Sequence, residues 1–398
     1  MRESALQHLV APGPAAGEPS LSMEAFRHEG EHVLEGVLRA RDGRCWWIEG
    51  GVPRLLGAGM YRSPVLEVRY ARELRRLGLG PPGAGVTSGR LHRIQSRTID
   101  RFGAEWLAFR DWGYHAEPPN GDALEFQGGL WGNTLAAFRS KTFLGGRLDD
   151  RLVLDAGCGN GRFTAAALAL GAREVIAVDI GWGVEAAFEH HKADRRVHVV
   201  QASLFELPVR AVEIAFSLGV LMHTGDAAGA FAQIARVVAP GGLFAVRMYH
   251  RGNWAYEAVD GAIRGTTTRL GKRSQLRFAR AMAAVGRRIA SAEARLARPG
   301  LRMRVYQVLR NWPTVHHNLD WWSAPVATHH TAPQVAAWAE SAGLELVRSE
   351  PKPDGGPYGF WSWPEALTML FARPAIALGA RGGNAVSAHR PPAAVGAA

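Results

Sequence analysis

From Leu152 onward, short apolar runs alternate with stretches whose apolar residues recur every three or four positions. The short runs predict buried strands, and the stretches between them predict amphipathic helices. Strands and helices in regular alternation are typical of an α/β protein with a parallel sheet and helices on both of its faces. The predicted strands are residues 152–157, 174–180, 197–203, 212–220 and 241–250, and the helices are residues 163–172, 184–191 and 227–238.

The pattern changes on either side of this region and divides the chain into six segments. The first is poorly periodic, and the second combines a Gly/Pro-rich linker with stretches of helical spacing. The last is rich in Ala, Gly, Arg and Pro without any apolar period, which predicts disorder. The segments are 1–57, a small N-terminal extension; 58–150, the linker and N-terminal helices; 151–250, the ligand-binding core; 251–330, a basic helical cap insert; 331–374, the C-terminal part of the sheet; and 375–398, the tail.

The composition fits a globular protein with a sizeable core. Of 398 residues, 47% are hydrophobic and 21% are charged, which is usual for folded domains. No apolar run approaches the roughly 18 residues of a membrane span, and the N-terminus lacks the pattern of a secretory signal. The two cysteines, Cys45 and Cys158, cannot build a disulfide framework, so we expect a cytoplasmic protein.

Positive charge is concentrated in the insert. Residues 264–310 hold thirteen Lys and Arg against one acid, Glu293, a surplus that accounts for the whole net charge of +11. Such a surface can contact nucleic-acid phosphates, lie on a membrane, or be the solvated face of an amphipathic helix.

A glycine-rich loop follows the first predicted strand of the core. In VLDAGCGNGRF, residues 153–163, glycines stand at alternate positions directly before a predicted helix. Glycines remove the β-carbons that would keep a ligand away from the backbone amides of a helix N-terminus. Asp179 ends the second strand, where a carboxylate can accept the hydroxyls of a ribose. The pattern therefore predicts a nucleotide-containing cofactor.

Five motifs in order resemble those of class I S-adenosylmethionine-dependent methyltransferases. They are D-x-G-C-G-x-G-R, V-D, Q-x-D-x-x-x-L-P with serine in place of the aspartate, S-x-G-V-L-x-H-T and P-G-G, and together they extend over about Leu152 to His250. The resemblance implies a Rossmann-like methyltransferase sheet and S-adenosyl-L-methionine as the cofactor.

The resemblance also assigns cofactor contacts. It implies that Asp155 and Gly157 face the methionine end and that Asp179 holds the ribose. The adenine would approach Ser203 and Leu204, where the family usually has an aspartate. A serine hydroxyl is a weaker acceptor than a carboxylate, so we expect packing and backbone contacts to contribute there. Further expected members of the site are Gly159 and Gly161, which shape the turn, and Ser217, after the fourth strand.

The first 57 residues are similar to a zinc-ribbon module that precedes some bacterial methyltransferases, chiefly in the ending GGVPRLL. Tetrahedral zinc requires thiolate or imidazole ligands. The four ligand positions are occupied by Ala11, Pro14, Ala40 and Gly43. We therefore predict a degenerate module without metal; an unrelated β-hairpin cap is the alternative.

Side chains near the ends of the fourth and fifth strands are candidates for catalysis. Methyl transfer requires alignment of the acceptor and, for a hydroxyl, removal of its proton. Histidine suits that removal. The candidates are His250, His223 and Tyr249, although His223 belongs to a motif of methyltransferases with unlike substrates, which favours a structural role.

The insert carries the candidate acceptor site. Its segment NLDWWSAPVATHHT resembles the cap of the same bacterial methyltransferases, which implies that Asp320, Trp321 and His329 line the acceptor pocket. Tryptophans of the cap would enclose an organic acceptor. A divalent metal is the alternative reading for His316, His317, Asp320, His329 and His330.

Three functions remain open at this point. The sequence favours methylation of a small molecule at oxygen, nitrogen or an activated carbon. The basic insert keeps an rRNA or tRNA methyltransferase as the alternative, and the altered zinc and adenine positions keep a non-catalytic binding protein as a second one. No feature of the sequence predicts an oligomeric state.

Overall fold

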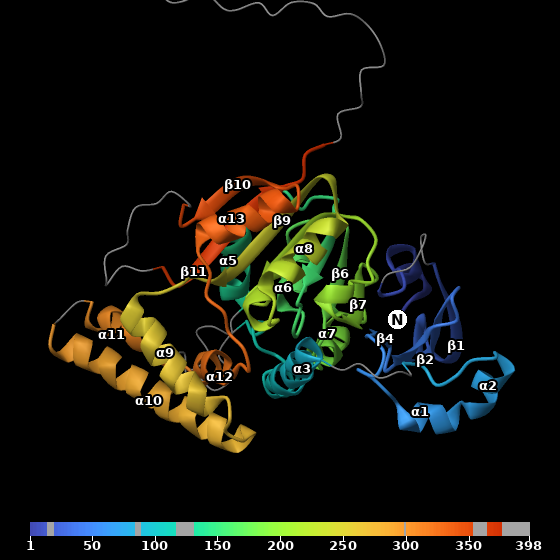
Figure 1. Ribbon diagram of the computed structural model, residues 1–398, viewed down its shortest axis with the longest axis horizontal. Coiled ribbons are helices and arrows are strands. Elements are labelled where there is room, and N and C mark those ends of the chain that lie inside the picture. Colours follow the sequence, from blue (N-terminus) through green and yellow to red (C-terminus); the bar gives the residue numbers. More distant parts are fainter. Residues whose placement is uncertain (14–19, 84–88, 117–130, 298–299, 353–363, 376–398) are drawn as a thin grey trace, which may run out of the picture.

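The computed structural model describes residues 1–13, 20–83, 89–116, 131–297, 300–352 and 364–375. Within them the strands form one sheet in the order β1-β2-β3-β4-β7-β6-β5-β8-β9-β11-β10. Figure 1 shows the antiparallel N-terminal strands at one end of the molecule and the insert helices at the other. Apart from Ala375, the tail predicted to be disordered lies outside the described residues, as does Pro14.

The centre of the sheet is parallel, as the alternation predicts. Its strands run in the order β7-β6-β5-β8-β9. The order reverses between β5 and β8, and at such a switch point ligands bind beyond the carboxyl ends of the strands. The strands are β5 (Leu152–Ala156), β6 (Glu174–Asp179), β7 (Val197–Ala202), β8 (Val212–Leu218) and β9 (Val238–Tyr249).

Helices cover both faces because side chains alternate along each strand. Leu154 and Ile176 belong to a core cluster with α8 (Ala227–Val237) and α13 (Ala332–Ser341). Val153 and Val175 point the opposite way and pack with α5 (Trp131–Thr142) and α6 (Arg162–Ala169). On this second face α7 (Gly183–His191) covers β6 and β7.

One edge of the core is antiparallel. The strand β11 (Ala366–Ala372) pairs antiparallel with β9, and β10 (Glu345–Glu350) pairs antiparallel with β11. An apolar pattern indicates which face of a strand is buried, but it does not indicate whether the strand runs parallel or antiparallel to its neighbour. The two strands were therefore predictable from the sequence, and their direction was not.

The N-terminal extension joins the opposite edge. After the short helix η1 (Glu3–His8), four strands pair antiparallel in chain order: β1 (Leu21–Glu29), β2 (His32–Ala40), β3 (Cys45–Glu49) and β4 (Val52–Leu55). The last of them pairs parallel with β7. Arg54 on β4 donates to Gln201 on β7 at 3.0 Å and pairs with Glu185 on α7. The extension thus continues the central sheet.

Helices before and after the core form the remaining walls. The stretch 65–77 folds as two helices, α1 (Pro64–Arg69) and α2 (Ala71–Arg76), and is followed by α3 (Arg90–Ala108). The insert contains α9 (Trp254–Thr267), α10 (Lys272–Arg295), α11 (Leu301–Leu309) and α12 (Val315–Ser323). Among the described helices, none combines the length and apolar character that a membrane crossing requires.

Candidate active site

A cavity of about 370 Å³ lies at the carboxyl edge of the parallel strands. The loops after β5, β6, β7 and β8 and the end of β9 all contribute to its wall, as expected for a doubly wound sheet. Small-molecule sites span roughly 300–1,000 Å³. The residues from these loops are Gly157, Asp179–Gly181, Ser203–Phe205, Leu218–Val220, His223, Thr224, Arg247 and Tyr249.

Two helices complete the cavity. Along α3 the lining residues recur at helical spacing, so one face of this helix forms the wall. These residues are Gln95, Thr98, Phe102 and Trp106. From α12 the lining residues are His316, His317, Asp320 and Trp321. Since α12 belongs to the insert and contacts both α3 and α9, the insert encloses the end of the cavity that contains Asp320.

The glycine loop approaches the cavity at Gly157. This residue has φ +96°, and an added Cβ would lie 2.3 Å from Cγ2 of Val220, so any side chain would be strained and crowded. Gly159 and Gly161 also have positive φ but do not line the cavity. The turn therefore brings backbone, rather than side chains, to the cavity wall.

Asp155 lies behind this loop. It is buried, and its carboxylate accepts a 2.7 Å hydrogen bond from Thr164. Burial is the main reason that its pKa rises to about 7. Asp155 is not among the residues that line the cavity. In this structure it fastens the loop to α6, and its predicted contact with a cofactor stays a prediction.

Asp179 occupies the wall beside the glycine loop. One carboxylate oxygen accepts from the Gly159 amide at 2.9 Å, and the other accepts from the Gly181 amide at 2.7 Å. Burial raises the pKa of Asp179, although the backbone donors oppose that rise. Each oxygen of a carboxylate has a second acceptor site, so Asp179 is oriented by two loops and retains capacity to accept from a ligand.

The loop after β7 provides a mixed surface. Ser203 accepts from the Phe205 amide at 3.3 Å, and Gln95 on α3 donates to the same hydroxyl at 3.2 Å. Ser203 and Leu204 line the cavity beside Phe205. Ser217, in contrast, donates to the Ala156 carbonyl at 2.8 Å and is buried away from the cavity. The structure thus adds Gln95 to the predicted adenine region.

Two of the predicted catalytic residues, His223 and Tyr249, line the cavity. The Nδ1 of His223 lies 2.7 Å from the Val326 carbonyl, and its Nε2 has no partner within the described residues. A carbonyl only accepts, so the hydrogen is on Nδ1 and Nε2 is free to accept. Burial lowers the pKa of His223 to about 3. Burial raises the pKa of Tyr249 well above the ordinary tyrosine value.

His250 lies elsewhere. Its Nδ1 is 2.6 Å from the Arg251 carbonyl, and its backbone amide donates to the Glu365 carbonyl at 3.1 Å. It forms an isolated bridge with His330 and does not line the cavity. The structure brings together His223 and Tyr249, whose ring centroids are 5.4 Å apart, without His250.

Of the three residues predicted to bind the acceptor, two line the cavity and one does not. Asp320 and Trp321 line the cavity, and His329 does not. The centroid of the Trp321 ring is 4.0 Å from that of Tyr249. His329 lies behind these rings and contacts the Tyr256 hydroxyl at 2.9 Å and Glu257 at 3.1 Å. Trp312 of the insert also lines the cavity, whereas Trp254 is 77% exposed.

Several lining residues were not predicted. Two of them could have been found in the sequence. Arg162 is the arginine of the glycine-loop motif, and Arg247 is a charged residue within the otherwise apolar strand β9. Lys141 lies on a helix that the apolar pattern predicts, but that pattern cannot tell which polar residues face a cavity. Gln95 lies in the first part of α3, ahead of the residues with helical apolar spacing. Glu365 also lines the cavity.

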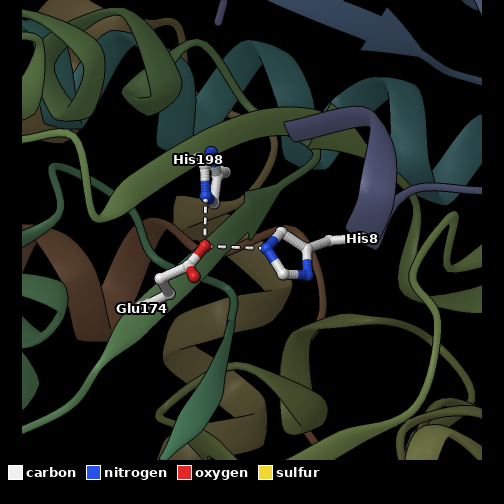
Figure 2. A group of neighbouring side chains, drawn as sticks. All are labelled: His8, Glu174 and His198. Atoms are coloured by element: carbon white, nitrogen blue, oxygen red, sulfur yellow. Dashed lines mark hydrogen bonds and ion pairs between the residues drawn. The ribbon is translucent and has the colours of Figure 1, made fainter. Parts of the chain in front are cut away.

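One His/Glu group within the described residues places its donor atoms close enough for a metal ion, and it is remote from the predicted sites. Figure 2 shows His8 and His198 directed at the same oxygen of Glu174, at 2.7 and 2.9 Å. These are hydrogen-bond distances, and the group ties η1 to β6 and β7. Among the described residues, the insert histidines considered as alternative metal ligands belong to no such group.

Comparison with known proteins supports the motif assignment. Residues 154–246 match the family model of the methyltransferase domain. A comparison with curated proteins found no match.

Similar solved structures include magnesium protoporphyrin IX methyltransferase from Synechocystis PCC 6803, at 15% identity over 69% of this chain and 97% of that chain, with a TM-score of 0.38. A second is 1,6-didemethyltoxoflavin-N1-methyltransferase from Burkholderia thailandensis, at 18% identity over 73% and 93%, with a TM-score of 0.39. A third is a putative sarcosine dimethylglycine methyltransferase from Galdieria sulphuraria, at 13% identity over 69% and 98%, with a TM-score of 0.41.

The family match coincides with the parallel strands whose loops form the cavity. It also coincides with the five motifs, from the glycine loop to P-G-G. Residues 154–246 therefore form a methyltransferase domain, and their motifs resemble those of class I S-adenosylmethionine-dependent methyltransferases.

Proposed function

We propose that this enzyme transfers the methyl group of S-adenosylmethionine to a small molecule held in the cavity at the end of the parallel sheet. The observation that carries the proposal is the continuity of this cavity. Asp179 and Ser203 line it at the edge of β6 and β7, and Asp320 and Trp321 line it beneath the insert. One cavity therefore contains both the residues predicted to bind the cofactor and the residues predicted to bind the acceptor.

The chemistry of the wall fits the cofactor. Asp179 retains acceptor capacity for ribose hydroxyls, and Gly157 leaves room for backbone approach. Leu204 and Phe205 offer apolar contact for a base, while Gln95 and Ser203 add polar groups. S-adenosylmethionine supplies a methyl group activated by the positive sulfur. The protein's own task is to align the acceptor and to exclude water.

Two side chains of the wall are placed to interact with an acceptor hydroxyl or amine, and they differ in basicity. The free Nε2 of His223 has an acceptor lone pair, but burial lowers the pKa of this residue to about 3, so it is a weak base that suits a hydrogen bond to the acceptor rather than removal of its proton. Asp320 also lines the cavity, and burial raises the pKa of its carboxyl group. A base with a raised pKa is a stronger proton acceptor. We assign Tyr249 and Trp321 to acceptor packing.

The position of the basic surface favours a small molecule over RNA. Helix α10 buries one face, and its arginines lie on the other, which is exposed. None of the residues of α10 or α11 lines the cavity. Two of the thirteen positively charged residues of segment 264–310 are not available at the surface. Arg264 is buried and pairs with Asp260, and Arg310 is buried over the Tyr256 ring. An RNA bound to the arginines of α10 would therefore contact a surface outside the cavity.

The test combines binding with label transfer. Calorimetry should detect S-adenosylmethionine and S-adenosylhomocysteine but not NADH. The protein is then incubated with methyl-labelled S-adenosylmethionine and either a small-metabolite extract or total RNA, with Asp179→Ala as the loss-of-function control. We expect label in small molecules. Label confined to RNA would replace this proposal with the RNA alternative, and binding without transfer to either pool would support the non-catalytic one.

A further inference from the structure

The acceptor end of the cavity contains three cationic side chains from separate elements. Lys141 comes from the end of α5, Arg162 begins α6, and Arg247 lies on β9. These elements pack on each other: α5 contacts both α6 and β9. The convergence follows from the tertiary fold, since the three residues are far apart in the sequence.

None of the three forms an ion pair with a carboxylate within the part of the chain that the structure describes. Arg247 donates to the Thr368 hydroxyl at 3.0 Å. The Arg162 guanidinium lies over the rings of Trp106 and Phe163, at 5.5 and 4.7 Å from their centroids. The Lys141 amine lies 6.0 Å from the Phe163 centroid. Their direct contacts are thus aromatic faces and one hydroxyl, while the carboxylates of Glu365 and Asp320 line the same cavity and act on them at longer range.

The pKa of Lys141 reflects these surroundings. Burial, followed by the positive charges of Arg247 and Arg162, lowers its pKa to about 7, although the negative charges of Glu365 and Asp320 oppose that decrease. Burial also lowers the pKa of Arg247. Like charges in a poorly solvated space repel each other and lack the hydration they would have in water. A bound anion would relieve both effects.

A bound cofactor would account for one of these cations. Arg162 directly follows the glycine loop and lines the cavity, so it would pair with the methionine carboxylate of S-adenosylmethionine. Lys141 and Arg247 then remain for the acceptor. Arginine binds carboxylate or phosphate through parallel N–H donors, and lysine adds a point charge.

Aromatic side chains also line this end of the cavity. Tyr249, Trp312 and Trp321 line it, and the Trp312 and Trp321 centroids are 5.2 Å apart. We propose that the methyl acceptor is a small aromatic compound that carries a carboxylate or phosphate group, with this oxyanion bound by Lys141 and Arg247. The inference rests on the proposed function and specifies its substrate class.

Protection of the Lys141 amine tests this subsite directly. The lysines of the chain are Lys141, Lys192, Lys272 and Lys352, so the other three serve as internal references. Protein saturated with S-adenosylhomocysteine is treated with a small amine-acylating reagent, and labelling of each lysine is followed by mass spectrometry. The probes are benzoate and phenyl phosphate, compared with neutral benzamide and phenol.

We expect benzoate, phenyl phosphate or both to slow labelling of Lys141 but not of Lys272, and the neutral analogues to have little effect. The stronger of the two anions identifies the oxyanion. In calorimetry, Lys141→Met and Arg247→Met should each weaken anion binding roughly tenfold or more, the loss expected for one charge-assisted hydrogen bond. Lys272→Met and Arg273→Met, on the exposed face of α10, are the matched controls.

Equal protection by the anions and their neutral analogues, or no protection by any probe, overturns the proposal. So does an anion preference that survives both cavity substitutions. Affinity for S-adenosylhomocysteine, measured in every variant, verifies that the cofactor site is folded. If the cofactor fails to bind while the anions still protect Lys141, the proposed function fails and the anion subsite stands.

Discussion

The imidazole Nδ1 of His223 donates to the carbonyl oxygen of Val326 at 2.7 Å. The donor belongs to the loop after β8, and the acceptor follows α12 of the insert. This contact therefore joins the methyltransferase core to its cap and fixes which nitrogen of His223 carries the hydrogen. A protonated His223 would place a second hydrogen on the buried Nε2, which has no acceptor within the described residues.

Stability should consequently depend on the charge state of His223. Its folded pKa is about 3, below the ordinary histidine value of about 6.5. Between these values the unfolded chain binds the proton and the folded chain does not, so the free energy of unfolding falls as the pH drops below about 6.5. At pH 5 this residue should cost about 2 kcal/mol relative to pH 7.5.

Urea unfolding of the wild type and of His223→Gln at both pH values measures this effect. The variant should lose less stability on acidification, whatever its stability at pH 7.5. The same loss in both proteins would contradict the assignment of His223 as a buried neutral imidazole.

Asp179→Ala should weaken binding of S-adenosylhomocysteine by roughly 10- to 100-fold, because a carboxylate that accepts from ligand hydroxyls contributes about 1.5–3 kcal/mol for each hydrogen bond. Calorimetry gives the affinity, and thermal unfolding verifies the fold. Glu189→Ala, an exposed carboxylate on α7, is the matched control. An unchanged affinity in Asp179→Ala would remove this residue from the cofactor site.

Gln95→Leu should lower cofactor affinity severalfold. The substitution introduces an apolar side chain of similar size on α3 and removes the amide that contacts Ser203. If this amide helps to bind the adenine, adenosine should compete less strongly for the cofactor site of the variant, in parallel with the loss of cofactor affinity. Competition by methionine for the same site should be unchanged. A variant that binds adenosine normally would restrict Gln95 to positioning the loop. Gln233→Leu, on α8 outside the cavity, is the control.

Glu174→Ala should lower the free energy of unfolding by about 1–3 kcal/mol, because His8 and His198 would both lose their hydrogen-bond partner. Cofactor affinity should be unaffected, since none of the three residues lines the cavity.

Metal dependence is the informative second measurement on this cluster. We expect neither EDTA nor added zinc chloride to change the melting temperature of the wild type, because both Nε2 atoms already bond to the carboxylate (Figure 2). A zinc-induced increase that disappears in His8→Ala would instead reveal a metal site.

Charge reversal on α10 separates the small-molecule and RNA functions. In Arg277→Glu/Arg280→Glu, both side chains are exposed and outside the cavity, so cofactor affinity and transfer to small molecules should be retained. RNA binding, if present, should weaken and lose part of its salt dependence. Loss of small-molecule transfer in a folded variant would contradict the assignment of the acceptor to the cavity.

The sequence was sufficient for the core and its ligand edge. Strands such as β5 are short and apolar, and the motif residues stand at their carboxyl ends: Gly157 directly follows β5, and Asp179 ends β6. These features are local, and one chain suffices to read them. The cofactor class followed from the order of the motifs.

The acceptor end could not be derived in the same way. Lys141, Arg247 and Asp320 come from α5, β9 and α12, and their meeting depends on how the insert packs on the sheet. His250 and His329 were predicted from their positions near strand and cap motifs, yet they lie outside the cavity wall because their rings contact neighbouring backbone and side chains instead.

The pairing of β4 with β7 has a consequence for the edge of the sheet. Without the N-terminal strands, β7 would end the sheet with a row of unpaired amides and carbonyls, a template for strand addition by another molecule. Arg54 and Leu55 occupy part of that row through their pairing with Gln201 and Ala202. The bulged ladder of β1 and β2, with charged side chains such as Arg27 and Glu35, then forms the outermost edge. The extension therefore covers part of a strand edge that would otherwise be unpaired, and this pairing requires no metal.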